Sequence, residues 1–149
     1  MKVERTFLMV KPDGVARGLI GEVLSRIERK GLKIAALKMI RVSRDAAEKL
    51  YAVHRGKPFF EKLIDHVTSG PVVVAVVEGR NAVEAVRTLI GDTCSYKAKP
   101  GSIRGDFGLD VTMNIVHAAD SEAVAGRELS IFFNDDEIFN YSRGCERWI

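Results

Sequence analysis

Four polar clusters interrupt otherwise simple apolar segments of the chain, at residues 11–14, 87–93, 99–106 and 114–121. Three of the four carry cations or hydroxyls, which are the groups that suit phosphate. Each cluster falls at the end of an expected strand or helix, where a rigid scaffold presents functional side chains. Any one cluster, taken alone, fits a solvated loop as well as a phosphate site. The chemistry they indicate is the binding of a phosphate-bearing ligand by side chains.

His117 is a candidate nucleophile. It follows a short apolar segment, residues 113–116, and precedes an expected helix N-terminus, a setting that could turn its imidazole toward a cleft. Glu128 on that helix could hydrogen-bond one ring nitrogen and leave the other free to form a covalent intermediate. A lone histidine also fits a structural role, and spacing alone leaves both interpretations open. His54 and His66 are expected to be surface or partly buried residues.

The spacing of other residues argues against a metal site and against the common phosphate-binding loops. No second His or Cys stands at ligand spacing from His117. Residues 56–57 lack the upstream glycine and the following Ser or Thr of a Walker A motif. The glycines within 14–21 and within 101–108 do not have the spacing of a dinucleotide-binding fingerprint.

Phe59 and Phe60 stand side by side near the start of an expected helix. Adjacent helical residues point in different directions, so one ring could face the core while the other meets a ligand. Periodicity alone favours the packing of both rings inside the protein.

The elements that must position these residues are predicted from hydrophobic periodicity and turn residues. Strands are expected at residues 6–10, 34–42, 72–77 and 113–116. Amphipathic helices are expected from residue 20 to a C-cap glycine at 31, from an N-cap at 43 to 51, from 58 to 67, from an N-cap at 81 to 91, and from an N-cap at 121 to 131. Residues 11–14 are expected to form a turn and residues 92–110 a long irregular loop.

This order of elements predicts an α+β fold, a ferredoxin-like βαββαβ sandwich with a four-stranded antiparallel sheet. The two helices between residues 43 and 67 read as an inserted helical hairpin, and the last helix and tail follow the sheet. A doubly wound α/β fold is the lower-ranked alternative, because only four strands are available.

Composition and charge are those of one soluble globular domain over residues 1–149. Of the 149 residues, 46% are apolar and 29% charged, and the net charge is +3. Such a mild basic excess suits a small anionic ligand better than a long polyanion, so nucleic acid binding is expected to be incidental at most.

Cysteine usage and the N-terminal segment predict a cytoplasmic protein. Cys94 and Cys145 lie far apart and form no CxxC pair, as expected in a reducing compartment. The first residues include no apolar signal-type region, and no segment approaches the roughly 20 apolar residues of a membrane helix.

Several separated motifs, in order along nearly the whole chain, resemble those of nucleoside diphosphate kinases. They are Lys11-Pro12-Asp13-Gly14, Pro58-Phe59-Phe60, Ser69-Gly70-Pro71-Val72, Lys99-Pro100-Gly101-Ser102-Ile103-Arg104-Gly105-Asp106-Phe107, and Asn114-Ile115-Val116-His117 with Asp120-Ser121. The resemblance implies ping-pong transfer of a terminal phosphate between nucleoside triphosphates and diphosphates, with broad base and sugar specificity.

The resemblance also implies roles for individual residues. His117 would become phosphohistidine, oriented by Glu128, with Lys11 and Tyr51 completing the catalytic group. Phosphate and ribose contacts would come from Lys11, Tyr51, Arg87, Thr93, Arg104 and Asn114. The base would stack on Phe59 and be bordered by Leu63 and Val111.

Cofactor, assembly and an alternative function follow from the same resemblance. Mg²⁺ would be held mainly by nucleotide phosphates and water, with no direct protein ligand and Asp120 helping through water. A homohexamer is expected, with a tetramer as the alternative. Ala118 and Ala119 replace the Gly-Ser of the family, so slower but surviving catalysis is expected. The alternative is a nucleotide- or nucleic-acid-binding module with weak or no catalysis.

Overall fold

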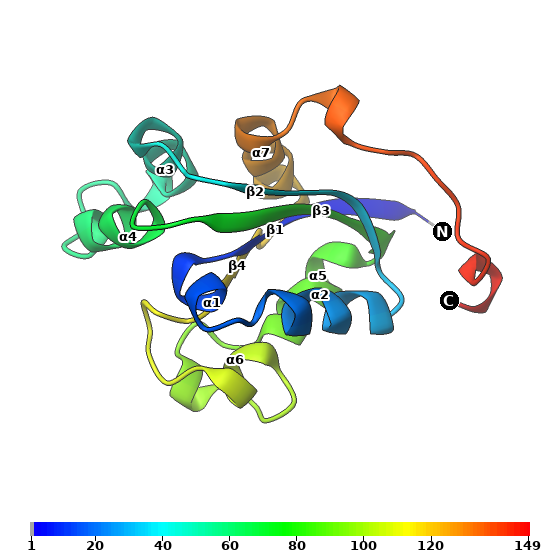
Figure 1. Cartoon of the computed structure of the whole chain (residues 1–149), viewed down its shortest axis with the longest axis horizontal. Coiled ribbons are helices and arrows are strands. Elements are labelled where there is room, and N and C mark those ends of the chain that lie inside the picture. The colour runs from blue at the N-terminus through cyan, green and yellow to red at the C-terminus, as the bar shows by residue number, and fades with distance from the viewer. Residues whose placement is uncertain (1) are drawn as a thin grey trace.

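Four antiparallel strands form the central sheet of the computed structural model, which describes residues 2–149 (Figure 1). The strands are β1 (Val3–Val10), β2 (Lys33–Ile40), β3 (Val72–Arg80) and β4 (Val116–Ala118), in the order β2-β3-β1-β4. β1 pairs with β3 over its full length, from Val3 opposite Arg80 to Val10 opposite Val73. Met1, which the predicted domain includes, lies outside the described residues.

Helices cover both faces of the sheet. They are α1 (Pro12–Ala16), α2 (Ile20–Arg29), α3 (Arg44–Leu50), α4 (Phe60–Val67), α5 (Ala82–Ile90), α6 (Ile103–Phe107) and α7 (Glu122–Phe132). Figure 1 shows α3 and α7 on one side of the sheet and α1, α2, α5 and α6 on the other, with α4 at one end of β3. The succession β1-α2-β2-β3-α5-β4, with the hairpin α3-α4 inserted after β2, confirms the predicted ferredoxin-like fold. No helix within residues 2–149 is long and apolar enough to cross a bilayer.

Two apolar cores lie on the opposite faces of the sheet because successive strand residues point to opposite sides. Phe7 and Met9 of β1 face α3, α4 and α7, and the Phe7 ring stacks on Phe132 at 5.1 Å between centroids. Leu8 and Val10 face α2 and α5. Burial on both sides explains the unbroken apolar run of β3.

The last predicted strand is present, but its predicted bounds, residues 113–116, were wrong, because β4 begins only at Val116. Ile115 has a φ of 77°, which breaks the extended conformation. The Asp110 carboxylate accepts a hydrogen bond from the Met113 amide at 2.9 Å, which takes that segment into a turn. As a result, His117 lies inside β4 rather than after it.

Short helices were missed within the predicted turn and within the predicted irregular loop. Residues 11–14, predicted to be a turn, lead into α1, which has Pro12 at its first position, where a missing N–H costs nothing. The predicted irregular loop at 92–110 contains a 3₁₀ turn, Ser95–Lys97, and α6, whose N-cap Ser102 accepts a hydrogen bond from Gly105 N. Helices of three to five residues show too little periodicity to be recognised in a sequence.

The expected capping role of Asn81 is also corrected. Asn81 stands at the N-cap position of α5 with a φ of 54°, but its side chain makes no capping hydrogen bond. The carboxylate of Glu4 on β1 accepts from the Val83 amide instead, at 3.1 Å. A residue distant in the sequence thus supplies the cap, which local sequence cannot indicate.

Gly14 allows α1 to pack against the segment before β4. A Cβ atom built on Gly14 would lie 2.8 Å from the Ile115 carbonyl oxygen and 2.8 Å from Val10 Cγ1. We therefore expect Gly14→Ala to lower the free energy of unfolding by about 1–3 kcal/mol through overpacking. Gly126→Ala is the matched control, because a Cβ atom there meets no atom within 4 Å. We expect it to raise the free energy of unfolding by about 0.5–1 kcal/mol, since alanine favours the helical conformation of α7. Urea unfolding of both variants checks this, and equal stabilities would contradict it.

Candidate active site

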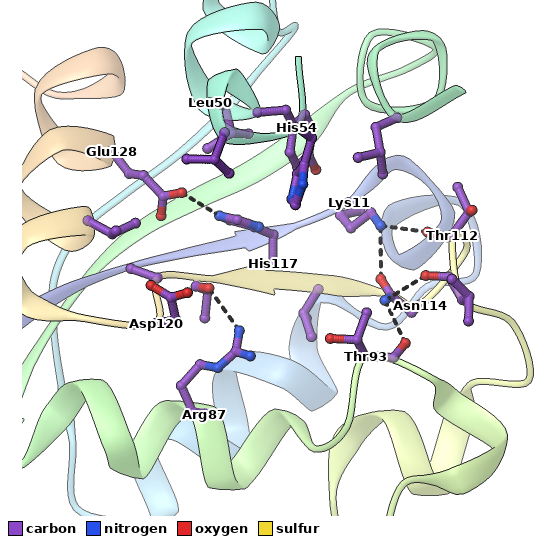
Figure 2. A pocket seen from close by; sticks show the side chains of 18 of the residues that line it. Lys11, Leu50, His54, Arg87, Thr93, Thr112, Asn114, His117, Asp120 and Glu128 are labelled. Carbon is purple, nitrogen blue, oxygen red and sulfur yellow. Dashed lines mark hydrogen bonds and ion pairs between the residues drawn. The ribbon is translucent and has the colours of Figure 1, made fainter. Parts of the chain in front are cut away.

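One pocket of about 470 Å³ collects all the side chains predicted to act on the ligand (Figure 2). It is enclosed by the α3-α4 hairpin, the segment from α5 to β4, and the start of α7. The predicted residues that line it are Lys11, Tyr51, Phe59, Leu63, Arg87, Thr93, Arg104, Val111, Asn114, His117, Asp120 and Glu128. Segments more than one hundred residues apart in sequence thus meet at one site.

His117 and Glu128 form the centre of the pocket. Glu128 Oε2 lies 2.8 Å from His117 Nε2, and the Glu128 side chain is buried with 2% of its surface exposed. An ionised carboxylate is an acceptor only, so Nε2 carries the proton of this bond. Nδ1 is then the ring nitrogen with an available lone pair. Glu128 Oε1 has no hydrogen-bond partner among the described residues.

Two aromatic rings hold the imidazole in place. Phe7 contacts it from the sheet at 6.0 Å between ring centroids, and Tyr51 meets it edge-on at 5.8 Å and 84°. Burial, together with the nearby Glu128 charge, raises the pKa of the Tyr51 hydroxyl well above its ordinary value. The phenol therefore stays protonated and can donate a hydrogen bond to an anion.

Lys11 supplies a buried cation at the end of β1. Its Nζ donates to the Thr112 carbonyl oxygen at 2.6 Å and to Asn114 Oδ1 at 2.8 Å. An ammonium has three donors, so one remains for a ligand. Burial lowers the pKa of Lys11 to about 8, with the neighbouring Arg104 contributing in the same direction. Lys11 is thus charged at neutral pH and gains from an anion placed beside it.

Arg104 supplies a second buried cation, held by main-chain carbonyls instead of carboxylates. Its guanidinium donates to the carbonyl oxygens of Asn114, Gly91 and Val116 at 3.1, 3.1 and 2.6 Å. Burial and the adjacent charge of Arg87 lower its pKa to about 10, so it remains protonated. Within residues 2–149 its hydrogen bonds go to main-chain carbonyls and none goes to a carboxylate, so its charge is available to an anionic ligand.

Arg87, Thr93 and Asn114 complete the polar wall. Arg87 Nη1 donates to the Ala118 carbonyl oxygen at 3.1 Å, so the guanidinium extends from α5 toward β4 (Figure 2). Asn114 Nδ2 donates to the carbonyl oxygens of Thr93 and Val111 at 3.0 and 2.9 Å, so the amide joins two loops around Lys11.

The apolar end of the pocket comes from the α3-α4 hairpin. Phe60 is buried in the core with 8% exposed, whereas Phe59 is 45% exposed and lines the pocket. The expectation that both rings pack inside was wrong. The other possibility, one ring in the core and one in the pocket, is what the structure has. Leu63 and the exposed Val111 border the same region.

Several pocket residues were not predicted to belong to the site. His54, expected at the surface or partly buried, is half-buried and lines the pocket, with its ring 5.2 Å from that of Phe59. Thr112 was missed because it contributes a main-chain carbonyl, for which sequence holds no signal. Arg127 lines the pocket beside Glu128, and its position one residue before a predicted site residue was the available signal.

Direct metal coordination by the protein finds no support within residues 2–149. No group of three or more His, Cys, Asp or Glu side chains there could hold a metal ion. Asp120, an exposed carboxylate on the rim, fits a cation that arrives already bound to a ligand. The site therefore combines an imidazole bonded to a buried carboxylate, two buried cations and an apolar surface.

Comparison with known proteins gives this arrangement a family. The family model described as nucleoside diphosphate kinase matches residues 4–138. A nucleoside diphosphate kinase of Archaeoglobus fulgidus is 62% identical over 147 residues, which cover 99% of this chain and 97% of the relative. One of Ignicoccus hospitalis is 63% identical over 136 residues, covering 91% of this chain and 92% of the relative.

Solved structures agree with the sequence relatives. The structure of a halophilic nucleoside diphosphate kinase from Halobacterium salinarum, in complex with CDP, superposes with a TM-score of 0.97 at 46% identity. The match covers 99% of this chain and 98% of that one. A nucleoside diphosphate kinase of Aquifex aeolicus gives a TM-score of 0.89 at 44% identity, covering 93% and 100%.

The buried Lys11 yields a pH dependence for anion binding. Because its pKa is lowered to about 8, the cation is present below that pH and lost above it. We expect the affinity for ADP to weaken as pH rises through about 8, since the phosphates lose a charged partner. Calorimetric titration from pH 6.5 to 9.5 measures this. Lys11→Met should bind more weakly and lack the inflection, and an unchanged inflection in that variant would show that another group titrates.

Proposed function

The chain belongs to the nucleoside diphosphate kinase family, and we propose that it transfers the γ-phosphate of a nucleoside triphosphate to a nucleoside diphosphate through a phosphohistidine on His117. The observation that carries this assignment is the 2.8 Å contact between Glu128 Oε2 and His117 Nε2 at the centre of a pocket lined by cations. It fixes one ring nitrogen as a donor and leaves the other as a nucleophile.

In the first half-reaction the Nδ1 lone pair of His117 attacks the γ-phosphorus. The bond from that phosphorus to the bridging oxygen breaks, and the nucleoside diphosphate leaves with the electron pair. Positive charge develops on the imidazole ring, and the Glu128 carboxylate stabilises it through the Nε2 proton. In the second half-reaction a terminal oxygen of another nucleoside diphosphate attacks the phosphohistidine, and the phosphorus–nitrogen bond breaks.

Charge stabilisation comes from groups that the fold holds without neutralising them. Phosphoryl transfer depends mostly on positioning and electrostatics, because negative charge spreads over the oxygens of the moving group. Lys11 and Arg104 each keep unused donors after their bonds to the protein. The protonated Tyr51 hydroxyl adds a neutral donor beside His117.

Broad base specificity follows from the apolar end of the pocket. A base that stacks on the exposed Phe59 ring meets a face that accepts every base, since each base has a π-face. Leu63 and Val111 add apolar contacts without hydrogen-bonding groups on their side chains. All the common nucleoside diphosphates are therefore expected acceptors.

The family generally needs a divalent cation, and Mg²⁺ is the ion proposed here. Mg²⁺ keeps several waters and is commonly carried by nucleotide phosphates, which fits a site with a single carboxylate on its rim. When bound, the ion would neutralise charge on the phosphates. Asp120 would contact it through water.

Assembly into a homo-oligomer, a hexamer or alternatively a tetramer, is supported by the exposed edge of the sheet. β2 is an edge strand, and the tail following α7 covers only part of it, with Phe139 N bonded to the Ala35 carbonyl oxygen. Leu37 and Met39 farther along β2 are 49% and 57% exposed. Unpaired edges with exposed apolar side chains favour pairing with another chain.

Domain organisation and location complete the proposal. The two cores share one sheet, which supports a single domain over residues 1–149. Cys94 and Cys145 are both free, which supports a reducing compartment and a cytoplasmic location.

Transfer of label tests the proposed reaction. Stoichiometric protein mixed with Mg²⁺ and γ-labelled ATP should acquire an acid-labile, base-stable label, and GDP added after removal of nucleotide should discharge it into GTP. His117→Ala should bind ADP but acquire no label, because the nucleophile is missing. Labelling of that variant would contradict the assignment of His117 as the phosphorylated residue. Wild-type protein that binds ATP without becoming labelled would favour the binding-module alternative.

The substitution Glu128→Gln isolates the contribution of the carboxylate charge. The amide side chain keeps an oxygen acceptor for Nε2 of His117 but lacks the negative charge that stabilises the imidazolium. We expect the rate of His117 phosphorylation to fall by roughly 10²-fold or more. Affinity for ADP, measured by calorimetry, should change little because Glu128 bonds to the ring. A large loss of ADP affinity would contradict this assignment.

A further inference from the structure

A strained turn precedes the strand that carries His117. Ile115 has a φ of 77°, and the Val116 amide donates to the Asn114 carbonyl oxygen at 2.8 Å, closing a three-residue turn. A β-branched residue is rarely found in this conformation, which is unfavourable for its side chain. Surrounding contacts must therefore hold it.

The start of α1 holds both polar main-chain groups of Ile115. The Lys11 amide donates to the Ile115 carbonyl oxygen at 2.8 Å, and Asp13 Oδ2 accepts from the Ile115 amide at 2.9 Å. Gly14 lets the two segments come this close, since any Cβ there would strike the Ile115 carbonyl. The Asp13 carboxylate is thus one of the two hydrogen-bond partners from the start of α1 that hold the strained residue.

The turn separates two parts of the site and sets their relative position. On one side of the turn, Asn114 accepts a hydrogen bond from the Lys11 ammonium. On the other side, His117 provides the proposed nucleophilic nitrogen. Arg104 donates to the carbonyl oxygens of both Asn114 and Val116. A relaxation of Ile115 toward ordinary backbone angles would therefore move a buried cation and the imidazole relative to each other.

His66, which no step of the proposed reaction uses, holds the other oxygen of the same carboxylate. His66 Nε2 lies 2.9 Å from Asp13 Oδ1, with the two side chains 17% and 10% exposed. Burial raises the pKa of Asp13, but the hydrogen bonds from His66 and Ile115 and the Lys11 charge outweigh it and leave the pKa below its ordinary value. The carboxylate is therefore ionised and an acceptor only, so Nε2 donates.

We propose that His66 is a positioning residue for phosphoryl transfer, whose N–H orients the Asp13 carboxylate so that it holds Ile115 in its strained conformation. The rate effect in this inference rests on the proposed function, whereas the contact itself does not. His66 lies on α4, so the hairpin that presents Phe59 to the base is linked by this bond to the turn beside the nucleophile. The relative position of Lys11 and His117 then depends on how the α3-α4 hairpin packs against α1.

A purely structural role predicts a different pattern. If the His66–Asp13 pair only fastened α4 to α1, its loss would lower stability while the folded fraction kept its full rate. A positioning role requires that the folded protein itself react more slowly, with nucleotide still bound. The two cases are separated by measuring rate and affinity on protein whose folding has been verified.

A pair of variants at position 66 provides the test. His66→Gln keeps an N–H donor near the position of Nε2, and His66→Leu removes it at similar volume. In His66→Leu we expect the single-turnover rate of His117 phosphorylation at saturating ATP to fall about tenfold or more, with ADP affinity within about twofold of wild type. His66→Gln should recover most of the rate. Thermal unfolding of each variant verifies that the assayed protein is folded.

Hydrogen exchange of the Ile115 amide gives a readout independent of catalysis. It should quicken roughly tenfold in His66→Leu, while amides in the centre of β3 keep their wild-type rates. A wild-type phosphorylation rate in His66→Leu, equal losses in the Leu and Gln variants, or unchanged Ile115 exchange would overturn the inference. If wild-type protein fails to label at all, the proposed function fails, and Ile115 exchange still decides whether His66 acts on the turn.

Discussion

Burial of the Glu128 carboxylate against the His117 ring is the interaction on which the rest of the site depends. A charged side chain with only 2% of its surface exposed is costly unless it is paired, and the bond to Nε2 is the partner that the structure provides. To form this bond, α7 must lie against β1, where Phe7 and Phe132 pack between helix and sheet. The apolar core thus fixes the tautomer of the imidazole, and the tautomer determines which nitrogen can react.

The cations obey a complementary constraint. Lys11 and Arg104 are buried, and within residues 2–149 their hydrogen bonds go to carbonyl and amide oxygens rather than to carboxylates. Burial lowers their pKa values to about 8 and about 10, although the nearby Asp13 charge acts in the opposite direction on both groups. Both residues line the pocket and keep donors that their bonds to the protein do not use, which supports the proposed binding of phosphate there. The strained turn at Ile115 contributes to the same arrangement, because it fixes the positions of Asn114 and His117 relative to the two cations.

Much of this was accessible from sequence, for physical reasons that differ between residues. The alternation of β1 and the apolar run of β3 predicted the sheet, and motif resemblance predicted the twelve site residues that the pocket collects. The turn at Ile115 was not predictable, because a β-branched residue indicates a strand and tertiary bonds from Lys11 and Asp13 impose the opposite. The bond from Lys11 to the Thr112 carbonyl oxygen and the capping of α5 by Glu4 were likewise not predictable, because each joins segments that are distant in the sequence.

The position of the phosphoryl group on the His117 ring tests the central arrangement most directly. Nitrogen-15 and phosphorus-31 NMR of the phosphorylated protein, with its histidines labelled, distinguishes the two ring nitrogens. Phosphorus coupled to Nδ1, with a proton on Nε2, is the result predicted by the bond between Nε2 and Glu128. Phosphorus on Nε2 would contradict it, because a protonated Nε2 that donates to the carboxylate has no lone pair with which to attack phosphorus.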